Sequence, residues 1–216
     1  MQIIKDIDQR SDQWFHLRLN SIGGSGIKKV TAKGQGKVRT TYLRKLAYQT
    51  ITGRYIKGYQ DSDMVLGNES EPEAIKAYSF FNAIPVEQVG MVINGDRKHY
   101  SPDSLTICGN GLVEVKNINE IGFVEVLQRQ KYAPKHDKQM QWGLSICERE
   151  WCDFVQSHYI RKYDDFGDYE IVPGIEEIPI WTKRVYRDEK LIKELHAEAD
   201  RFLEDLDNLV ERIKKR

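Results

Sequence analysis

The sequence has few cysteines, no excess charge of either sign and no long apolar run. Its three cysteines are Cys108, Cys147 and Cys152, an odd and scattered set that suggests reduced thiols and supplies neither a disulfide framework nor a four-cysteine cluster. Lysine plus arginine equals aspartate plus glutamate, at 33 each, which argues against a protein that simply coats DNA. No stretch approaches the ~18 apolar residues that a membrane span needs.

What is present is sufficient for a folded enzyme. With 216 residues, 40% of them hydrophobic and four of them tryptophan, we expect a single domain over residues 1–216 that ends in a helix over about 188–216. The first residues lack the hydrophobic region of a signal peptide, so we expect a cytoplasmic protein, in the host cell if the gene is a phage gene.

The spacing of apolar residues predicts alternating helices and strands. We expect helices over 41–51, 64–81, 121–130, 136–147 and from 188 onward, with strands over 86–93, 104–107, 112–115, 151–159 and 178–186. Charged residues in the last strand are typical of a sheet edge. This order predicts an α/β (α+β) fold, in which helices flank a central mixed β-sheet and the C-terminal helix packs on the core.

The segment from Ser101 to Lys116 reads as a hairpin that carries three functional groups. Turn residues at 108–111 separate its two strands. Glu114 and Lys116 are two residues apart and therefore share one face of a strand. If Ile107 pairs with Leu112, Asp103 lies opposite Lys116 and all three functional groups face the same side.

Neighbouring carboxylates repel each other unless a cation lies between them. Oxygen ligands without a thiolate or imidazole suit Mg²⁺ or Mn²⁺, and such an ion acts on phosphate esters by polarising the phosphate and activating water. A lysine beside it can orient that water or offset charge. The alternative is an ordinary cross-strand ion pair between Glu114 and Lys116.

Three upstream segments could add to such a site. Around residues 14–27, a helix with Trp14 on its apolar side is followed by a second helix with Ser25 as N-cap, and Arg18 lies near this phosphate-compatible terminus. An ordinary helix-loop-helix is the alternative.

Residues 28–39 are basic and contain no acid, which indicates a mobile surface loop that contacts DNA or simply carries solvated lysines. In helix 64–81, Glu71 shares a side with Ala74 and Tyr78, and the helix is kinked or restarted at Pro72.

Several of these motifs occur in the order of one known family. The chain resembles the phage lambda exonuclease and YqaJ-type viral recombinase nucleases of the PD-(D/E)xK superfamily, which have a restriction-endonuclease-like core. The superfamily signature corresponds to Pro102-Asp103 and Glu114-Val115-Lys116. Further similar segments are Trp14 with 17–19, residues 22–25, the 67–74 helix with Glu71, and Gln139-Met140-Gln141.

The resemblance implies a Mg²⁺-dependent exonuclease, for which Mn²⁺ can substitute, that degrades one strand of duplex DNA from a 5′-phosphorylated end and leaves a 3′ single strand for recombination. By the same resemblance, the metal ligands are Asp103, Glu114, the Val115 carbonyl and Glu71, and Lys116 activates water. Arg18 and Ser25 bind the terminal phosphate, and Gln141, more than Gln139, contacts the catalytic water or the scissile phosphate. The resemblance also implies a homo-oligomer, because relatives can form a toroidal homotrimer and work with a phage single-strand annealing protein.

The chain departs from the family pattern at two places. Ser104 replaces the glycine that usually follows the aspartate, and Gly23-Gly24 replaces a threonine-alanine pair, which would make the phosphate loop more mobile. Other functions stay open: a Cas4-like or RecB-like nuclease, although three cysteines argue against the four-cysteine iron–sulfur cluster of many such proteins, a restriction-type endonuclease, or a non-catalytic DNA-end-binding protein.

Overall fold

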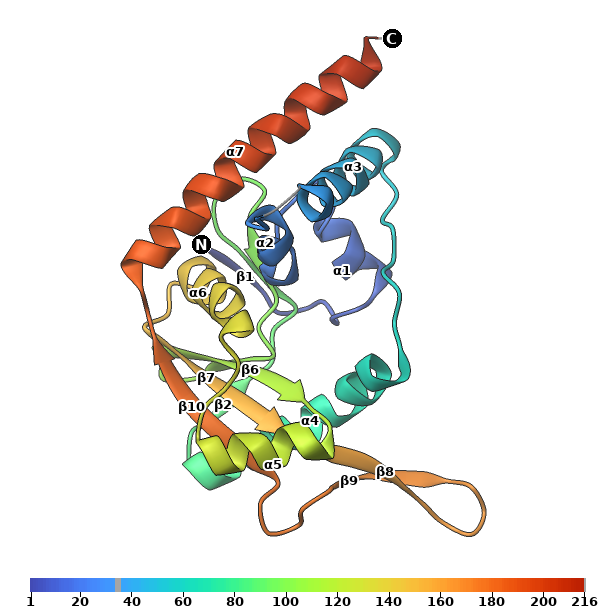
Figure 1. The fold of residues 1–216 in the computed structure, drawn as a ribbon, viewed down its shortest axis with the longest axis vertical. Coiled ribbons are helices and arrows are strands. Elements are labelled where there is room, and N and C mark those ends of the chain that lie inside the picture. Colours follow the sequence, from blue (N-terminus) through green and yellow to red (C-terminus); the bar gives the residue numbers. More distant parts are fainter. Residues whose placement is uncertain (34–35, 216) are drawn as a thin grey trace.

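The computed structural model describes residues 1–33 and 36–215 and has a mixed α/β architecture (Figure 1). The predicted fold class, a mixed central sheet with flanking helices and a C-terminal helix, is confirmed. The helices are α1 (Asp12–Leu17), α2 (Gly24–Val30), α3 (Lys37–Thr52), α4 (Ser62–Asn82), α5 (Glu120–Arg129), α6 (Asp137–Ile146) and α7 (Glu189–Lys214), with a 3₁₀ turn at Pro134–His136 before α6.

The central sheet has five strands in the order β10-β7-β6-β5-β2. Its members are β2 (Val86–Glu87), β5 (Ser104–Thr106), β6 (Gly111–Asn117), β7 (Trp151–Ser157) and β10 (Ile180–Tyr186). Only the β6–β7 pair is parallel, and α5 and α6 form its connection. As predicted, the strand that ends at Tyr186 lies at a sheet edge.

Helices cover both faces of this sheet, because its central strands are buried on both sides. On one face, Val113, Val115 and Val155 pack with Ala74 and Tyr78 of α4. On the other, Leu112 and Phe154 join a larger core that includes Met140 and Trp142 of α6. Glu114 and Lys116 alternate with the valines, so their side chains belong to the α6 side of β6.

Two smaller β structures accompany the sheet. One has the order β1-β3-β4, formed by β1 (Gln2–Ile4), β3 (Met91–Ile93) and β4 (His99–Tyr100), and the other is a ribbon of β8 (Tyr159–Tyr163) and β9 (Tyr169–Pro173) that projects from the body in Figure 1. The single strand predicted over 86–93 is wrong, because β2 and β3 belong to different sheets. The short strands β1 and β9 were not predicted from the sequence.

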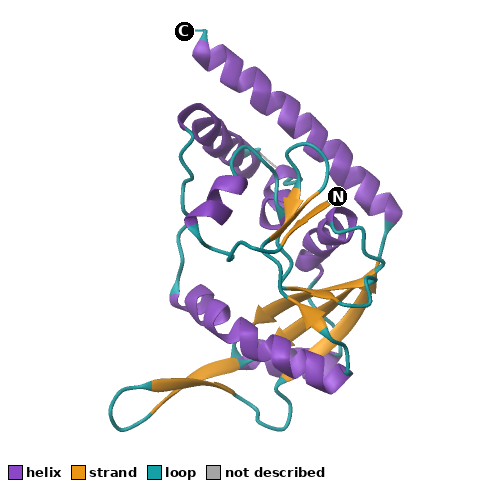
Figure 2. Cartoon of the chain, turned by 180° about the vertical axis from the view of Figure 1, so that it is seen from behind, coloured by secondary structure: helices purple, strands orange, loops and turns teal. Residues whose placement is uncertain are grey.

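The helices α2, α3 and α7 pack together on the side of α6 away from the sheet, and α7 runs past α3 to the C-terminus (Figures 1 and 2). The helix α7 packs on the core, as predicted. Its buried side chains are Ile192, Leu195, Ala199, Phe202, Leu203, Leu206 and Val210, whereas Ile213 is exposed.

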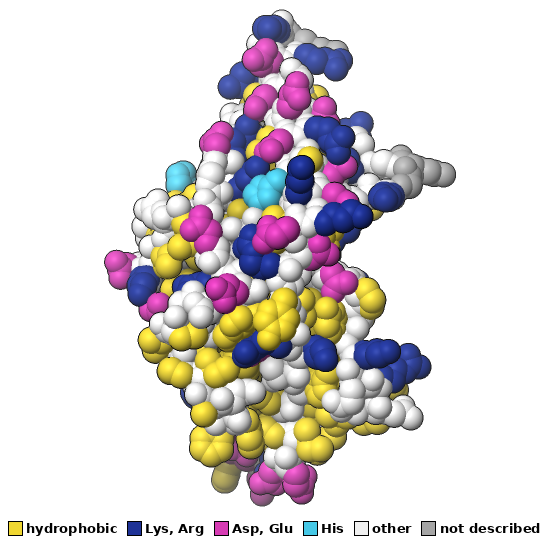
Figure 3. All heavy atoms as spheres, turned by 90° about the vertical axis from the view of Figure 1, so that its left-hand side faces the viewer, with side chains coloured by type: hydrophobic (Ala, Val, Ile, Leu, Met, Phe, Trp, Pro, Cys, Tyr) yellow, Lys and Arg dark blue, Asp and Glu magenta, His cyan; other side chains and the backbone are white. Residues whose placement is uncertain are grey.

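The basic segment 28–39 is not one loop. Its first residues end α2 and its last residues begin α3, because both helices extend further than the local sequence indicates. Residues 31–36 lie between the two helices, and of these only residues 34 and 35 fall outside the described residues. Figure 3 shows that the face over α7 carries basic and acidic side chains mixed together. Among the described residues, no helix combines the length and hydropathy needed to cross a bilayer.

Candidate active site

The β5–β6 hairpin brings Asp103 and Glu114 together, but in a different register from the one predicted. Ser104 pairs with Val113 and Leu105 with Leu112, so Asp103, one residue before β5, lies opposite Glu114 and not opposite Lys116. The difference is two residues, which preserves the face to which each side chain points. Asp103 Oδ2 accepts a hydrogen bond from the Val115 backbone N–H at 2.6 Å, which fixes the carboxylate against the next strand.

Glu114 is a buried carboxylate, only 2% exposed, with every oxygen partnered. The Tyr100 hydroxyl donates to Oε2, the Gln139 side-chain amide donates to Oε1, and the Lys116 ammonium lies 2.6 Å from Oε1. Burying a charge without such donors would be strongly unfavourable. Burial and the Glu114 carboxylate both raise the pKa of Tyr100 well above its usual value, which keeps this phenol a hydrogen-bond donor.

The Lys116 ammonium occupies a position in this site that favours a positive charge. It contacts Glu114 Oε1 at 2.6 Å and donates to the Val115 carbonyl oxygen at 2.8 Å. Burial disfavours its charged form, but Glu114 and Asp103 outweigh that effect and raise its pKa above the usual lysine value. Lys116 is therefore a protonated group at neutral pH, suited to orienting an oxygen or offsetting negative charge.

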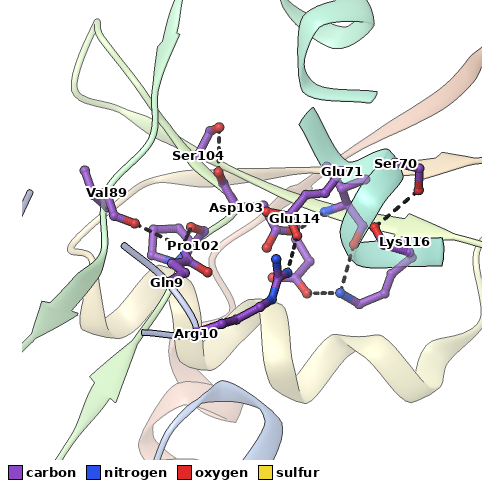
Figure 4. Close-up of polar contacts among 12 residues, drawn as sticks. Gln9, Arg10, Ser70, Glu71, Val89, Pro102, Asp103, Ser104, Glu114 and Lys116 are labelled. Atoms are coloured by element: carbon purple, nitrogen blue, oxygen red, sulfur yellow. Dashed lines mark hydrogen bonds and ion pairs between the residues drawn. The ribbon is translucent and has the colours of Figure 1, made fainter. Parts of the chain in front are cut away.

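A third carboxylate comes from α4. This helix continues through Pro72 as one element, so a second helix does not start there. Glu71 projects from α4 toward Glu114 and Lys116 (Figure 4), as the interior-facing prediction required, and its Oε2 accepts a hydrogen bond from Arg10 Nη2 at 2.8 Å. Burial, together with the negative charges of Glu114 and Glu71, raises the pKa of Asp103 well above its usual value.

The donor set fits a hard divalent cation. Three carboxylates and the Val115 carbonyl offer only oxygen, which is the chemistry that Mg²⁺ and Mn²⁺ prefer. As they stand, no three His, Cys, Asp or Glu side chains within residues 1–33 and 36–215 converge as ready metal ligands. Lys116 and Arg10 pair with two of the carboxylates. The Lys116 ammonium lies between the candidate ligand oxygens of Glu114 and Val115, which supports the fit to a cation.

The structure corrects the choice between the two glutamines of α6. Gln139 contacts Glu114, whereas Gln141 points away from this cluster. Gln141 donates to the carbonyl oxygen of Tyr186 at 2.8 Å and accepts from the Asp188 N–H at 2.8 Å, so it ties α6 to the start of α7. Two residues along a helix rotate a side chain by about 200°, so the two cannot face the same site.

A second polar site lies on the far side of β4. A cavity of about 60 Å³ is bounded by Arg18, Ser25, Lys29, Lys45 and Gln49, together with Ser21, Gly23, Gly26, Tyr42, Leu46, Tyr55 and His99. The Arg18 guanidinium stacks on Trp14 at 3.9 Å from the ring centroid, and burial lowers its pKa. The grouping of Arg18 with Ser25 predicted from the sequence is therefore found.

The local structure of this pocket differs from the prediction in two respects. Gly23, not Ser25, is the N-cap of α2, and Ser25 is exposed within the first turn. The two glycines do not make a mobile loop, because a Cβ atom at Gly23 would lie 2.3 Å from His99 Nε2 and one at Gly24 would lie 2.4 Å from the Tyr100 ring. They are needed for close packing of α2 on β4.

Lys45, Gln49 and Tyr42 of α3 were not predicted as pocket residues. Their spacing of three and four residues places them on one polar face of α3. This polar face could have been recognised from the sequence, but only the apolar positions of the helix were used for the prediction. Among the described residues, both polar atoms of the Gln49 side chain and Nε2 of His99 are buried without a hydrogen-bond partner. These unpaired groups are suited to binding a polar ligand.

Adjacent residues of β4 connect the two sites. The His99 ring lines the pocket and its Nδ1 is 2.8 Å from Ser21 Oγ, whereas the Tyr100 hydroxyl donates to Glu114 in the carboxylate cluster. Successive side chains of a strand point to opposite faces. The pocket and the carboxylate cluster are therefore held at a fixed separation by one short strand.

The chain is similar to known proteins over almost its whole length. Residues 13–150 match the model of the YqaJ-like viral recombinase domain. An alkaline exonuclease, LHK-Exo, from Laribacter hongkongensis is 29% identical, with a TM-score of 0.79 over 95% of this chain and 97% of that chain, and its complex with dAMP gives the same values. A phage-related exonuclease from Haemophilus somnus 129PT is 16% identical, with a TM-score of 0.70 over 89% of this chain and 96% of that chain, and shares the fold.

No curated protein matches the chain. The match to the family model covers more than half of the 216 residues and includes Arg18, Glu71, Asp103, Glu114 and Lys116. The protein therefore belongs to the YqaJ-like viral recombinase domain family.

Proposed function

We propose that this protein is a divalent-cation-dependent exonuclease that hydrolyses phosphodiester bonds of duplex DNA from a 5′-phosphorylated end. The observation that carries the proposal is the clustering of Glu71, Asp103, Glu114 and Lys116 beside a separate basic pocket around Arg18. Membership of the YqaJ-like family and similarity to an alkaline exonuclease support a nuclease. Arg18 and Ser25 bind the terminal phosphate in this proposal.

The side chains of the cluster divide the chemistry among them. Glu71, Asp103, Glu114 and the Val115 carbonyl would hold Mg²⁺ or Mn²⁺, and the bound ion supplies Lewis acidity toward the phosphate and a lowered pKa of water. Lys116, protonated between Glu114 and the Val115 carbonyl, orients the attacking water and offsets charge on the pentavalent phosphorus. Gln139, not Gln141, holds Glu114 in its orientation.

A broad groove whose lining includes Asn117, the residue after Lys116, offers a path for the strand. It encloses about 870 Å³ and is lined by three basic residues, Arg129, Lys131 and Lys135, and by three acidic ones, Asp63, Glu120 and Glu125. The basic residues are the part of the lining that suits a phosphate backbone. His136 lines the same groove, and burial together with Lys28, Lys116 and Lys135 lowers its pKa to about 4. We also propose, on the family resemblance alone, that the protein forms a ring-shaped homotrimer and works with a single-strand annealing protein.

The defining experiment uses linear duplex DNA labelled at either the 5′ or the 3′ end. We expect release of the 5′ label first, only with Mg²⁺ or Mn²⁺, because the end pocket and the carboxylate cluster lie close together. Covalently closed circular DNA should stay intact, since it has no end to enter the pocket. Cleavage of closed circles would instead indicate an endonuclease, and binding of ends without cleavage under any divalent ion would indicate an end-binding protein.

Substitution of Arg18 tests the role of the pocket. Arg18→Gln keeps an aliphatic stem over Trp14 but removes the guanidinium, and we expect the preference for a 5′ phosphate over a 5′ hydroxyl to fall by about 10-fold or more, the value of a charged hydrogen bond. Initial rates on paired substrates that differ only at the 5′ end measure this preference.

The matched control is Arg44→Gln, an exposed arginine on α3 outside the pocket. It should leave the preference unchanged. If Arg18→Gln kept the full preference, terminal phosphate binding would have to be assigned to another site.

A further inference from the structure

A short segment before α1 is fastened to the same chain segment that carries Asp103. The side-chain amide of Gln9 donates to the Val89 carbonyl at 3.0 Å and to the Pro102 carbonyl at 2.9 Å. Pro102 immediately precedes Asp103, so these bonds place residue 10 at the edge of the carboxylate cluster (Figure 4). The position of the next residue, Arg10, is therefore set by the active-site framework itself.

The backbone of Arg10 is in an unusual conformation for an arginine. Its φ is +70°, in the left-handed region that favours glycine and is disfavoured for residues with a Cβ atom. The Ser11 N–H donates to the Asp8 carbonyl at 3.2 Å, and Ser11 then caps α1 through Trp14 N–H. Glycine would be more stable than arginine at this position. The presence of arginine therefore suggests that its side chain has a function.

The Arg10 side chain reaches the cluster and leaves part of its guanidinium free. Nη2 donates to Glu71 Oε2 at 2.8 Å, and this is the only hydrogen bond of the guanidinium among the described residues. The Arg10 side chain is 41% exposed, whereas that of Glu71 is 15% exposed. The remaining N–H groups of the fork therefore have no hydrogen-bond partner among the described residues, on a side chain that is partly open to solvent.

A further cation at the edge of the cluster would favour the approach of a phosphodiester. Glu71, Asp103 and Glu114 repel its charge, and the Lys116 ammonium is shared with Glu114 and the Val115 carbonyl. A guanidinium presents several donors in one plane, which matches the oxygens of a phosphate. Among the described residues, Arg10 combines contact with the cluster, free donors and exposure.

We propose that Arg10 is a catalytic residue that binds a backbone phosphate of the DNA strand at the cutting centre, holding Glu71 with Nη2 while its free N–H groups contact the phosphate. This inference rests on the proposed nuclease function. Two other roles are outcomes of the test: Arg10 only orients Glu71, or Arg10 only competes with a divalent cation for Glu71.

The test compares Arg10→Gly, Arg10→Lys and Lys5→Ala. Glycine removes the guanidinium and suits a φ of +70°, so the unfolding temperature should stay at or above that of the unsubstituted protein, and a loss of function would not be a loss of fold. Lysine keeps the charge but not the planar fork. Lys5 lies in the same N-terminal region, forms an exposed ion pair with Glu87 and serves as the control.

The first readout is equilibrium binding to 5′-phosphorylated duplex DNA in Ca²⁺ at several salt concentrations. Loss of one phosphate contact should reduce the slope of log K against log salt by about 0.9 in Arg10→Gly, whereas Arg10→Lys and Lys5→Ala should keep the full slope. The second readout is the single-turnover cleavage rate in saturating Mg²⁺, which should fall by about 10- to 100-fold in Arg10→Gly and only partly recover in Arg10→Lys.

An unchanged salt slope in Arg10→Gly would overturn the proposal, whatever happened to the rate. A change confined to the Mn²⁺ concentration at which the protein without DNA is half-stabilised against heat would assign Arg10 to Glu71 alone. If the unsubstituted protein cleaved no DNA, the proposed nuclease function would fail, but the salt slope would still report whether Arg10 contacts a phosphate. The two failures are thus distinguishable.

Discussion

Replacing Lys116 by methionine is expected to reduce phosphodiester cleavage by roughly a thousand-fold, the range found when a charged group that stabilises a transition state is removed. Methionine keeps the apolar stem but removes the ammonium that lies between Glu114 and the Val115 carbonyl. Single-turnover rates on linear duplex at saturating Mg²⁺ measure the effect, because they are insensitive to product release.

The matched control is Lys183→Met, which removes an exposed ammonium from β10 in the same sheet. Its rate should equal that of the unsubstituted protein, and both variants should bind DNA in Ca²⁺. A Lys116→Met protein that cleaved at more than a tenth of the normal rate would show that the catalytic centre lies elsewhere.

Replacing Asp153 by alanine is expected to destabilise the fold by about 2–4 kcal/mol, less than for a fully buried ion pair, because the Arg184 side chain that would lose its partner is 37% exposed. The Asp153 carboxylate is only 3% exposed as a side chain. It accepts hydrogen bonds from Arg184 Nε and Nη2, each at 2.8 Å, and from the Tyr78 hydroxyl at 2.7 Å. Its loss would leave the Tyr78 hydroxyl and the Arg184 guanidinium without their partner between α4 and β10.

Asp207→Ala provides the comparison, because Asp207 also accepts two hydrogen bonds from an arginine, Arg97. Its side chain is 58% exposed, so the cost should stay below about 1 kcal/mol. Urea unfolding curves of both variants give the free energies of unfolding. Equal costs would mean that burial is not what makes the Asp153 network stabilising.

The parts of the fold that follow from local patterns were predictable from the sequence. The turn residues at 108–111 and the alternation of Val113, Glu114 and Val115 predicted the hairpin and the face that its acids share. An even shift in register does not change that face, which is why Asp103, Glu114 and Lys116 were grouped together although the pairing itself was wrong by two residues.

The parts that depend on tertiary contacts were not predictable in this way. Gln139 and Gln141 are equivalent in local sequence, and only the packing of α6 against β6 and the start of α7 decides which one meets Glu114. Arg10 is distant in sequence from Glu71, and its contact depends on the Gln9 bonds to two other chain segments. The strand β1 has too few residues to show a period and exists because β3 offers it an edge.

The short strand β4 gives the two sites a thermodynamic relationship. His99 lines the pocket and Tyr100 donates to Glu114, and Gly23 and Gly24 lie directly against the two rings. If filling the pocket alters the strand and changes cation affinity at Glu114, the cation must change affinity for the DNA end by the same factor. Binding of the DNA end at the pocket and binding of the cation at Glu114 would then be coupled, and each would strengthen or weaken the other equally.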